Sequence, residues 1–152
     1  MSTNDDVRIR PVEPADFDAW MPLWRGYQMF YEVDIAPETS RVTWDRFLDP
    51  REPMFAALAV AGDEAIGLVH WIMHRSCWTV GDYCYLQDLF VDKSMRGKRI
   101  GRQLIEYVYE AAAAAKCSRV WWLTQESNAT ARLLYDRIAD RSGFIQYRKI
   151  LT

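Results

Sequence analysis

The sequence predicts an α/β (α+β) fold in which a mixed central sheet of six to seven strands is flanked by about four helices. Short apolar, β-prone runs alternate with longer segments in which apolar residues recur at three- and four-residue steps, the helical period. Two of the strand-like runs are joined by Gly62-Asp63-Glu64, a hairpin signal. A chain of 152 residues is long enough to bury a sizeable core. We therefore expect residues 1–152 to form a single domain.

The N-terminal part of the chain predicts one strand and two helices. Residues 7–12 are expected to form the first strand and residues 14–31 the first helix, because the second segment carries apolar side chains at helical spacing. Pro22 and Gly26 lie inside that helix and predict a bend or a split. A second helix is expected to begin at a polar cap at position 39 or 40 and to end at position 48.

The middle of the chain predicts three strands and the longest helix. Residues 54–61 and 65–74 are the two arms of the hairpin, and a turn at 79–81 leads into a strand at 85–91. The helical period is clearest over residues 100–117, where one face is apolar.

The C-terminal part predicts a strand, a helix and a strand. Residues 119–124 have no polar break and are expected to form a buried strand. A helix capped by Ser127 or Asn128 extends to Ile138, and residues 144–151 are expected to close the chain as a strand.

The segment between the strand at 85–91 and the helix at 100–117 is strongly basic. The start of a helix exposes N–H groups and the positive end of the dipole, so cations there cost stability unless an anion lies among them. Together with Gly97 and Gly101, these cations suit a phosphate-binding site, and a solvated basic turn is an equally open alternative at this point. The cations are Lys93, Arg96, Lys98, Arg99 and Arg102.

Charge is distributed unevenly along the chain. Residues 1–90 carry 15 acidic and 7 basic side chains, whereas residues 91–152 carry 6 and 12, so balances of −8 and +6 sum to the net charge of −2. This asymmetry predicts two ligands of opposite sign. Nucleic acid is a poor partner for this pattern, because the basic residues concentrate in one loop. The N-terminus has no apolar leader and no run approaches the ~20 apolar residues of a membrane span, so a cytoplasmic protein without a membrane partner is expected.

A metal site is not expected. His70 and His74 have a spacing that suits zinc on a helix, but they fall in a predicted strand, where four residues span about 13 Å. Two ligands that far apart do not share an ion whose bonds are ~2 Å long. Cys77, Cys84 and Cys117 are odd in number and lack the spacing of a zinc site or a disulfide framework.

Residues 96–101, RGKRIG, resemble the signature of the GNAT superfamily of acyl-CoA-dependent N-acetyltransferases. That signature is Gln or Arg, two residues, Gly, one residue, then Gly or Ala, and Arg99 stands here in place of the middle glycine. Residues 124–135, TQESNATARLLY, resemble a later motif of the family, with Asn128 and Tyr135 at its two functional positions. The tail is similar to the subgroup that includes fungal histone and D-amino-acid acetyltransferases.

The resemblance implies a single GNAT-like domain that binds acetyl-CoA and transfers its acetyl group to a primary amine. It implies a homodimer as well. The residues that it assigns to coenzyme A are Phe90, Val91, Arg96, Gly97, Lys98, Arg99, Ile100, Gly101, Arg102, Asn128 and Arg132.

The resemblance further implies the catalytic residues. Tyr135 corresponds to the general acid that protonates the departing thiolate, and the main chain of Leu89 lies at the reacting centre. The general base is left open. Relatives often have a Glu where this chain has Gln87, and Asp88 is adjacent but expected, by strand alternation, to face away from Gln87 and Leu89. A water chain ending on a carboxylate of the first helices is an alternative base.

The acceptor is expected on the acidic first half of the chain. Acidic groups among aromatic rings suit an ammonium group through charge pairing and cation–π contact, and the alternative is a solvated acidic loop beside core aromatics. A small cationic amine, an amino acid or a lysine-like side chain is the expected acceptor. A non-catalytic acyl-CoA-binding or protein-interaction module is the alternative function, although a binding module has no need of a thiolate acid. The candidate acceptor-binding residues are Tyr27, Tyr31, Glu32, Asp34, Trp71 and Gln87.

Overall fold

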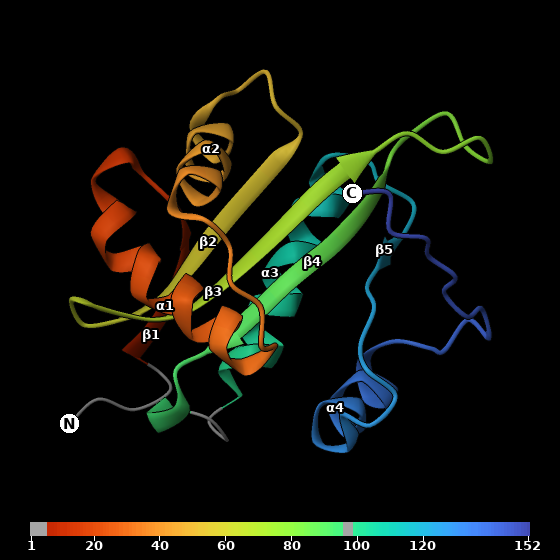
Figure 1. The fold of residues 1–152 in the computed structure, drawn as a ribbon. Coiled ribbons are helices and arrows are strands. Elements are labelled where there is room, and N and C mark those ends of the chain that lie inside the picture. The colour runs from red at the N-terminus through yellow and green to blue at the C-terminus, as the bar shows by residue number, and fades with distance from the viewer. Residues whose placement is uncertain (1–5, 96–98) are drawn as a thin grey trace. The chain divides into compact units, whose positions relative to one another are not determined.

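The structure is a computed structural model that describes residues 6–95 and 99–152. Its described residues contain one five-stranded sheet in the order β1-β2-β3-β4-β5 (Figure 1). Neighbouring strands are antiparallel from β1 to β4, whereas β5 is parallel to β4, so the sheet is mixed as predicted. The strands are β1 Val7–Pro11, β2 Met54–Ala61, β3 Glu64–His74, β4 Tyr83–Val91 and β5 Val120–Trp121.

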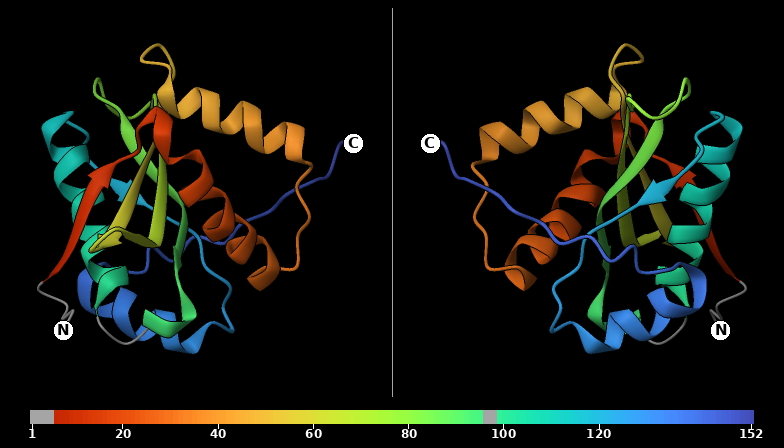
Figure 2. Two further views of the ribbon diagram at one scale, coloured as in Figure 1. Left: turned by 90° about the vertical axis from the view of Figure 1, so that its left-hand side faces the viewer. Right: turned by 90° about the vertical axis from the view of Figure 1, so that its right-hand side faces the viewer.

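Four α-helices accompany the sheet in the described residues. Residues 1–122 form one compact unit and residues 123–152 a second one, which contains α4. In the first unit, α1 and α2 cover one face of the sheet and α3 covers the other (Figure 2). The helices are α1 Phe17–Phe30, α2 Pro37–Leu48, α3 Ile100–Ala114 and α4 Ala129–Ile138, with short 3₁₀ helices at Pro14–Asp16 and Lys93–Met95.

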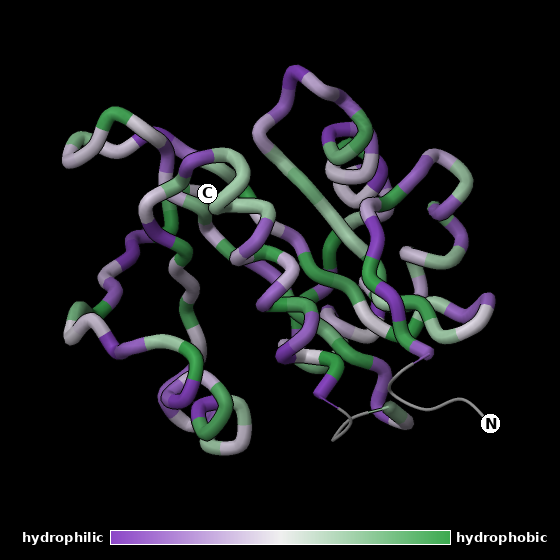
Figure 3. The backbone as a smooth tube through the Cα atoms, turned by 180° about the vertical axis from the view of Figure 1, so that it is seen from behind, coloured by the Kyte–Doolittle hydropathy of each residue, from purple (hydrophilic) through white to green (hydrophobic). Residues whose placement is uncertain are grey.

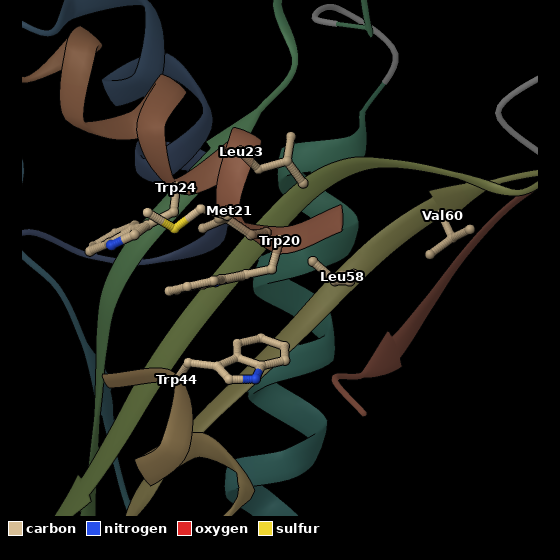
Figure 4. Packing of buried hydrophobic residues seen from close by; sticks show 8 residues of the cluster. Trp20, Met21, Leu23, Trp24, Trp44, Leu58 and Val60 are labelled. Atoms are coloured by element: carbon tan, nitrogen blue, oxygen red, sulfur yellow. The ribbon is translucent and has the colours of Figure 1, made fainter. Parts of the chain in front are cut away.

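The face covered by α1 and α2 holds an aromatic core. Trp20 and Trp44 are buried with ring centroids 4.9 Å apart, and Trp24 stacks on Trp20. Leu58 and Leu68 of the central strands belong to the same buried cluster, part of which is shown in Figure 4. The apolar stripe of the first helix is thus mainly core, because it packs against these strands. Figure 3 gives the hydropathy along the backbone.

The opposite face is closed by α3. Its buried residues recur at steps of three and four, which is the period predicted for this segment. Along β3, Leu68 and His70 face the aromatic core, whereas Trp71 faces α3 and packs its ring 6.0 Å from that of Tyr107. The residues of α3 that are buried are Ile100, Leu104, Ile105, Val108 and Ala112.

The pairing of β3 with β4 is interrupted by a bulge. His70 pairs with Asp88, but the next residue, Trp71, pairs with Leu86, so Gln87 is an additional residue in β4. Strict alternation would place Asp88 and Gln87 on opposite faces. The structure corrects that expectation, because the extra residue breaks the two-residue period and both residues line one pocket.

The first helix is continuous where a bend or split was expected. It contains Pro22 and extends over Phe17–Phe30, and the break falls earlier, after the 3₁₀ helix Pro14–Asp16. Gly26 has a packing role: a Cβ at this position would lie 2.7 Å from Cζ of Phe90. The close contact with a β4 ring, rather than flexibility, explains this glycine.

The second helix begins two to three residues before its expected cap. Pro37 occupies the first helical position, where a missing N–H costs nothing, and Ala36 is the N-cap residue. Ser40 is fully buried and its hydroxyl accepts a hydrogen bond of 3.0 Å from the indole of Trp24. Its polarity thus serves the core and not the helix end.

The expected count of six to seven strands is wrong for the described residues, which contain five. Residues 144–151 form no strand, and β5 is limited to two residues. A strand exists only through hydrogen bonds to a neighbouring strand. The unit of residues 123–152, all of which the structure describes, contains one helix and no second strand with which this segment could pair.

Candidate active site

A pocket of about 410 Å³ opens between α1, α2 and the middle of β3 and β4. Asp88 and Gln87 line it from the β4 bulge, and His70 lines it from β3. Its walls are mainly aromatic and aliphatic, and they include Trp24 and Phe47. We call it the Asp88 pocket, after the only carboxylate among its lining residues in the described part of the chain.

Asp88 is held by a buried hydrogen-bond chain. Its Oδ2 atom is 2.9 Å from Nδ1 of His70, and Nε2 of His70 accepts a hydrogen bond of 2.9 Å from the indole N–H of Trp20. The exposed fractions of Asp88, His70 and Trp20 are 7%, 2% and 0%. A carboxylate that is buried and hydrogen-bonded in this way has a fixed orientation.

Tyrosine hydroxyls surround the same carboxylate. Burial raises the pKa of Tyr27 strongly, and the charge of Asp88 and a hydrogen bond to it raise this pKa further. The pKa values of Tyr31 and Tyr85 are raised by burial and then by the Asp88 charge. These phenols stay protonated, so they present O–H donors and no competing negative charge.

The aromatic rings of the pocket form a stacked series. The rings of Trp24 and Tyr27 stack with centroids 5.0 Å apart, and Tyr27 lies 4.7 Å from Tyr31. Phe47 of α2 packs 4.6 Å from the imidazole of His70. A carboxylate among aromatic faces attracts a cation, with each cation–π contact contributing about 0.5–2 kcal/mol.

The predicted acceptor-binding residues are only partly brought together. Tyr27 and Gln87 line the pocket, and Tyr31 packs on Tyr27. Glu32 and Asp34 lie exposed in the loop after α1. Trp71 faces α3 on the other side of the sheet and stacks on Phe55, so it does not belong to the proposed site.

The first turn of α3 contains no acidic residue, and the side chain of its N-cap residue makes no capping hydrogen bond. Its N-cap residue, Arg99, is in the left-handed conformation with φ of 62°. Glycine adopts this conformation without strain, which explains why the resembled signature has glycine there. A Cβ on Gly101 would meet no atom within 4 Å, so the surface above this turn is open.

The basic residues around this turn differ in their contacts. Arg102 donates a 2.7 Å hydrogen bond to Glu106 along the helix, and Lys93 lies in the 3₁₀ helix that follows β4. Ile100 is buried under the helix start, so it can offer a ligand only its main chain. Arg96, Gly97 and Lys98 lie outside the described residues.

The edge of β4 is paired with β5 over a short distance. The register contains Cys84 with Val120 and Tyr85 with Trp121, whereas β4 continues to Val91. Leu89 pairs with Val69 of β3 and lies beyond the last β5 pair. The pairing of the two strands therefore ends before the segment in which main-chain contacts to the cofactor were expected.

The second unit carries the remaining candidates on one helix. Asn128 is the N-cap residue of α4, as predicted, although its side chain donates to Oγ1 of Thr124 at 3.4 Å and does not cap the helix. Arg132 donates to the carbonyl of Glu126 at 2.7 Å. Tyr135 follows Asn128 by seven residues, a spacing that puts both on the same helix face about 10 Å apart.

The sequence interpretation missed the hydrogen-bonding roles of Trp20 and His70 in the buried chain that holds Asp88. His70 was considered only as a metal ligand, and the described residues contain no cluster of metal-ligating side chains. Nδ1 of His74 donates to the carbonyl of Arg75 and Nε2 accepts from the indole of Trp121, so its partners are separate from those of His70. Only the β3–β4 register brings His70 to Asp88.

A sequence model of the Acetyltransferase (GNAT) family matches residues 18–139 of this chain. The chain is also similar to the D-amino-acid N-acetyltransferase HPA3 of Saccharomyces cerevisiae. The two are 36% identical over 148 residues, which are 96% of this chain and 92% of the yeast protein.

Solved structures of acetyltransferases share the fold. A probable acetyltransferase superposes with a TM-score of 0.84 at 23% identity, covering 95% of this chain and 98% of the other. AAC(6')-Iy, solved with a coenzyme A bisubstrate analogue, gives a TM-score of 0.82 at 17% identity, covering 95% and 99%. The ribosomal-protein-alanine N-acetyltransferase of Brucella melitensis gives 0.75 at 21% identity, covering 95% and 99%. No described helix is both long and apolar enough to cross a membrane.

Proposed function

This chain belongs to the GNAT family of acetyltransferases, and from that premise we propose that it moves the acetyl group of acetyl-CoA to a primary amine in the Asp88 pocket. The acceptor is a small cationic amine, an amino acid or a lysine-like side chain. The observation that carries this proposal is a buried, hydrogen-bonded carboxylate at a β4 bulge, inside an aromatic pocket. We also propose that residues 1–152 form one domain, since the matched family region includes parts of both compact units.

The start of α3 is the proposed holder of the coenzyme A pyrophosphate. An uncapped helix start without acidic residues favours an anion, and the space above Gly101 leaves room for its close approach. We assign to this role the main chain of Ile100 and Gly101 and the charges of Arg99 and Arg102. Arg96, Gly97 and Lys98 carry the same assignment from the family signature. Phe90, Val91, Asn128 and Arg132 are assigned to the rest of the cofactor.

Acetyl-CoA supplies the activated acetyl thioester when it is bound. Asp88 acts as the general base that takes a proton from the acceptor ammonium group, because a neutral amine is needed for attack. The main chain at Leu89 would orient the reacting carbonyl from the part of β4 that lies beyond its last pair with β5. Tyr135 would give its hydroxyl proton to the departing thiolate and take back the second proton that the acetylated nitrogen has to lose, so that the products are a neutral amide and a free thiol.

The acceptor class follows from the charge and shape of the pocket. An ammonium group is stabilised by Asp88 and by the rings of Tyr27 and Tyr31, and the exposed Glu32 and Asp34 attract it to the entrance. Gln87 lies next to Asp88 and supplies an uncharged amide for hydrogen bonding. A free amino acid is included among the acceptors because the yeast relative is a D-amino-acid N-acetyltransferase.

We also propose a homodimer and a cytoplasmic location. The C-terminal segment 144–151 is rich in exposed apolar side chains, a composition typical of a surface covered by a second copy. Cys77, Cys84 and Cys117 are all free thiols in the structure, and reduced thiols persist in the cytoplasm. Subcellular fractionation tests the location.

The test of the proposed activity is thiol release from acetyl-CoA with polyamines, D- and L-amino acids and basic peptides as acceptors. We expect release with at least one class, and a 10²–10⁴-fold lower kcat for Asp88→Asn, the loss typical of a general base. Thr43→Val is the matched control, because it alters the same pocket without removing a titratable group. Coenzyme A binding without thiol release for any acceptor would reject the activity.

A further inference from the structure

The hydrogen bonds around His70 determine where its proton lies. An indole N–H is only a donor, so Nε2 of His70 must be the acceptor in its 2.9 Å contact with Trp20. A neutral imidazole with a lone pair on Nε2 carries its hydrogen on Nδ1. That hydrogen points at Oδ2 of Asp88, 2.9 Å away.

The surroundings prevent His70 from changing this arrangement. The side chains of Trp20 and His70 are almost completely buried, so water does not replace either hydrogen bond. The rings of Phe47 and Trp24 pack 4.6 Å and 4.9 Å from the imidazole and restrict its rotation. A second proton on Nε2 would face the Trp20 N–H donor-to-donor, which costs the desolvation energy of two unpaired buried donors.

We propose that His70, held as the neutral Nδ1–H tautomer by Trp20, is the positioning residue that orients the Asp88 carboxylate toward the acceptor amine. This inference rests on the proposed function, in which Asp88 is the general base. His70 does not touch the substrate. It acts by occupying Oδ2, which leaves the remaining lone pairs of the carboxylate for the incoming ammonium group.

The same arrangement decides which group receives the proton. The ammonium N–H bond breaks and a carboxyl O–H bond forms on Asp88, which becomes neutral. His70 cannot take this proton onward, because Nδ1 already bears hydrogen and Nε2 is occupied by Trp20. The proton then leaves from Asp88 to solvent through the open side of the pocket.

The other groups facing Asp88 do not compete as bases near neutral pH. They are Tyr27 and Tyr31 from α1 and Tyr85 from β4, and burial raises the pKa of each. The α2 residues that line the pocket are Thr39, Thr43 and Phe47, none of which titrates near neutral pH. The experiment therefore has to distinguish the role of His70 from that of the Asp88 carboxylate.

Two amide substitutions separate positioning from simple packing. In His70→Asn the amide nitrogen is as many bonds from the backbone as Nδ1, so it can still donate to Asp88. In His70→Gln the amide oxygen reaches the place of Nε2, so it can accept from Trp20 but leaves Asp88 without its donor. We expect kcat within about fivefold of wild type for His70→Asn and a loss of about 10²-fold for His70→Gln, the lower end of acid–base effects. Both variants bury one amide, and their thermal melts identify any loss of folding.

The tautomer itself is measured by ¹⁵N NMR of the imidazole in the intact protein, which needs no acetyl transfer. We expect a protonated Nδ1 and an unprotonated Nε2 in the wild type. Trp20→Phe keeps an aromatic ring but removes the indole donor, so we expect a mixture of the Nδ1–H and Nε2–H tautomers of His70 in that variant. An Nε2–H tautomer in the wild type, or equal kcat values for His70→Asn and His70→Gln, would overturn the inference. Thiol release absent in the wild type would instead reject the proposed function.

Discussion

The carboxylate of Asp88 carries the negative charge of an otherwise uncharged pocket, and its neighbours determine what it can do. His70 donates to one oxygen, and Tyr27 lines the same pocket. Because burial and Asp88 raise the pKa of Tyr27, this phenol remains a donor at all physiological pH values. The Asp88 carboxylate is therefore a base surrounded by hydrogen-bond donors, and its remaining lone pairs face the pocket.

Replacing Tyr135 by Phe is expected to lower turnover by about 10²–10⁴-fold, since it removes the proposed acid and keeps the ring. The affinity for acetyl-CoA should change little, so steady-state kcat and the Kd from calorimetry are measured together. Tyr147→Phe in the exposed C-terminal segment is the matched control. Near-normal turnover of Tyr135→Phe at saturating acceptor would remove Tyr135 from the mechanism, provided that single-turnover kinetics exclude slow product release.

Neutralising Glu32 and Asp34 together is expected to raise the acceptor KM several-fold and to leave the acetyl-CoA KM unchanged. Both carboxylates are exposed at the end of α1, so their attraction for a cation is screened over ~10 Å at 0.1 M salt. The wild-type rate should therefore fall with added salt, and the double variant should lose this dependence. Asp63→Asn with Glu64→Gln, two exposed acids at the β2–β3 turn, is the control. Equal rates on cationic and neutral amines would refute electrostatic attraction of the acceptor.

At the scale of the element, the start of α3 combines a local strain with an open surface. Arg99 has φ of 62°, which costs a residue other than glycine roughly 1 kcal/mol. The helix makes no capping hydrogen bond there, whereas its other face is buried in the sheet. A helix end that is anchored but uncapped leaves N–H groups for an anion.

Replacing Gly101 by Leu is expected to weaken coenzyme A binding by more than tenfold, or at least about 1.4 kcal/mol. The added side chain meets no protein atom near its Cβ, so the melting temperature should stay the same or rise with the better helix propensity. Ala113→Leu at the exposed far end of α3 controls for propensity alone. Unchanged affinity by calorimetry would show that the pyrophosphate binds elsewhere.

The junction of β1 and α1 depends on a partly buried ion pair. Arg10 donates to both oxygens of Asp16 at 2.7 and 2.9 Å, and Asp16 also accepts from the main chain of Glu13. The hydrogen bond from Arg10 lowers the pKa of Asp16 below its ordinary value of 3.8. The pKa of Asp16 is lower in the folded protein than in the unfolded chain. The stabilisation that the ion pair gives the fold is therefore complete above pH 3.8, and it is lost as the pH falls through the folded-state pKa of Asp16.

Asp16→Asn is therefore expected to cost about 1–3 kcal/mol of unfolding free energy at neutral pH. The difference from wild type should shrink as the pH falls below about 4, because the wild type loses the same charge. Urea unfolding between pH 7 and pH 3 measures both effects. Asp49→Asn is the control, since that carboxylate pairs with Arg51 in an exposed loop and its loss should leave the midpoint unchanged.

At the scale of the whole molecule, the C-terminal segment is the surface expected to contact a second copy. We expect wild-type protein to have the mass of a dimer in multi-angle light scattering, and Ile145→Asp with Leu151→Asp to have that of a monomer. Both side chains are apolar and largely exposed, so burying them would favour association. Arg148→Asp changes the charge of the same segment without removing apolar area and should remain dimeric. A monomeric wild type at micromolar concentration would contradict the dimer.

The types of most elements could be predicted from sequence because they depend on local periodicity. The apolar spacing of residues 100–117 predicted α3, and Gly62 with its neighbours predicted the β2–β3 hairpin. The anion site at the basic turn before Ile100 stays a prediction, and it needed the family signature, because the physics of a helix end alone left a solvated basic turn equally open. Helix starts were less predictable, as α2 shows, because a proline at the first position competes with a polar cap.

The sequence by itself determined the fold class, the acidic and basic halves and the two family motifs, all of which are properties of residues near one another in the chain. Only the tertiary structure decided that Asp88 shares a pocket with Gln87, because a bulge shifts the β3–β4 register by one residue. The pairing of His70 with Asp88, 18 residues apart, and of Trp20 with His70, 50 apart, depends on that register and on the packing of α1. Whether residues 144–151 form a strand likewise depends on a partner, because backbone hydrogen bonds between strands are made by two segments and encoded in neither alone.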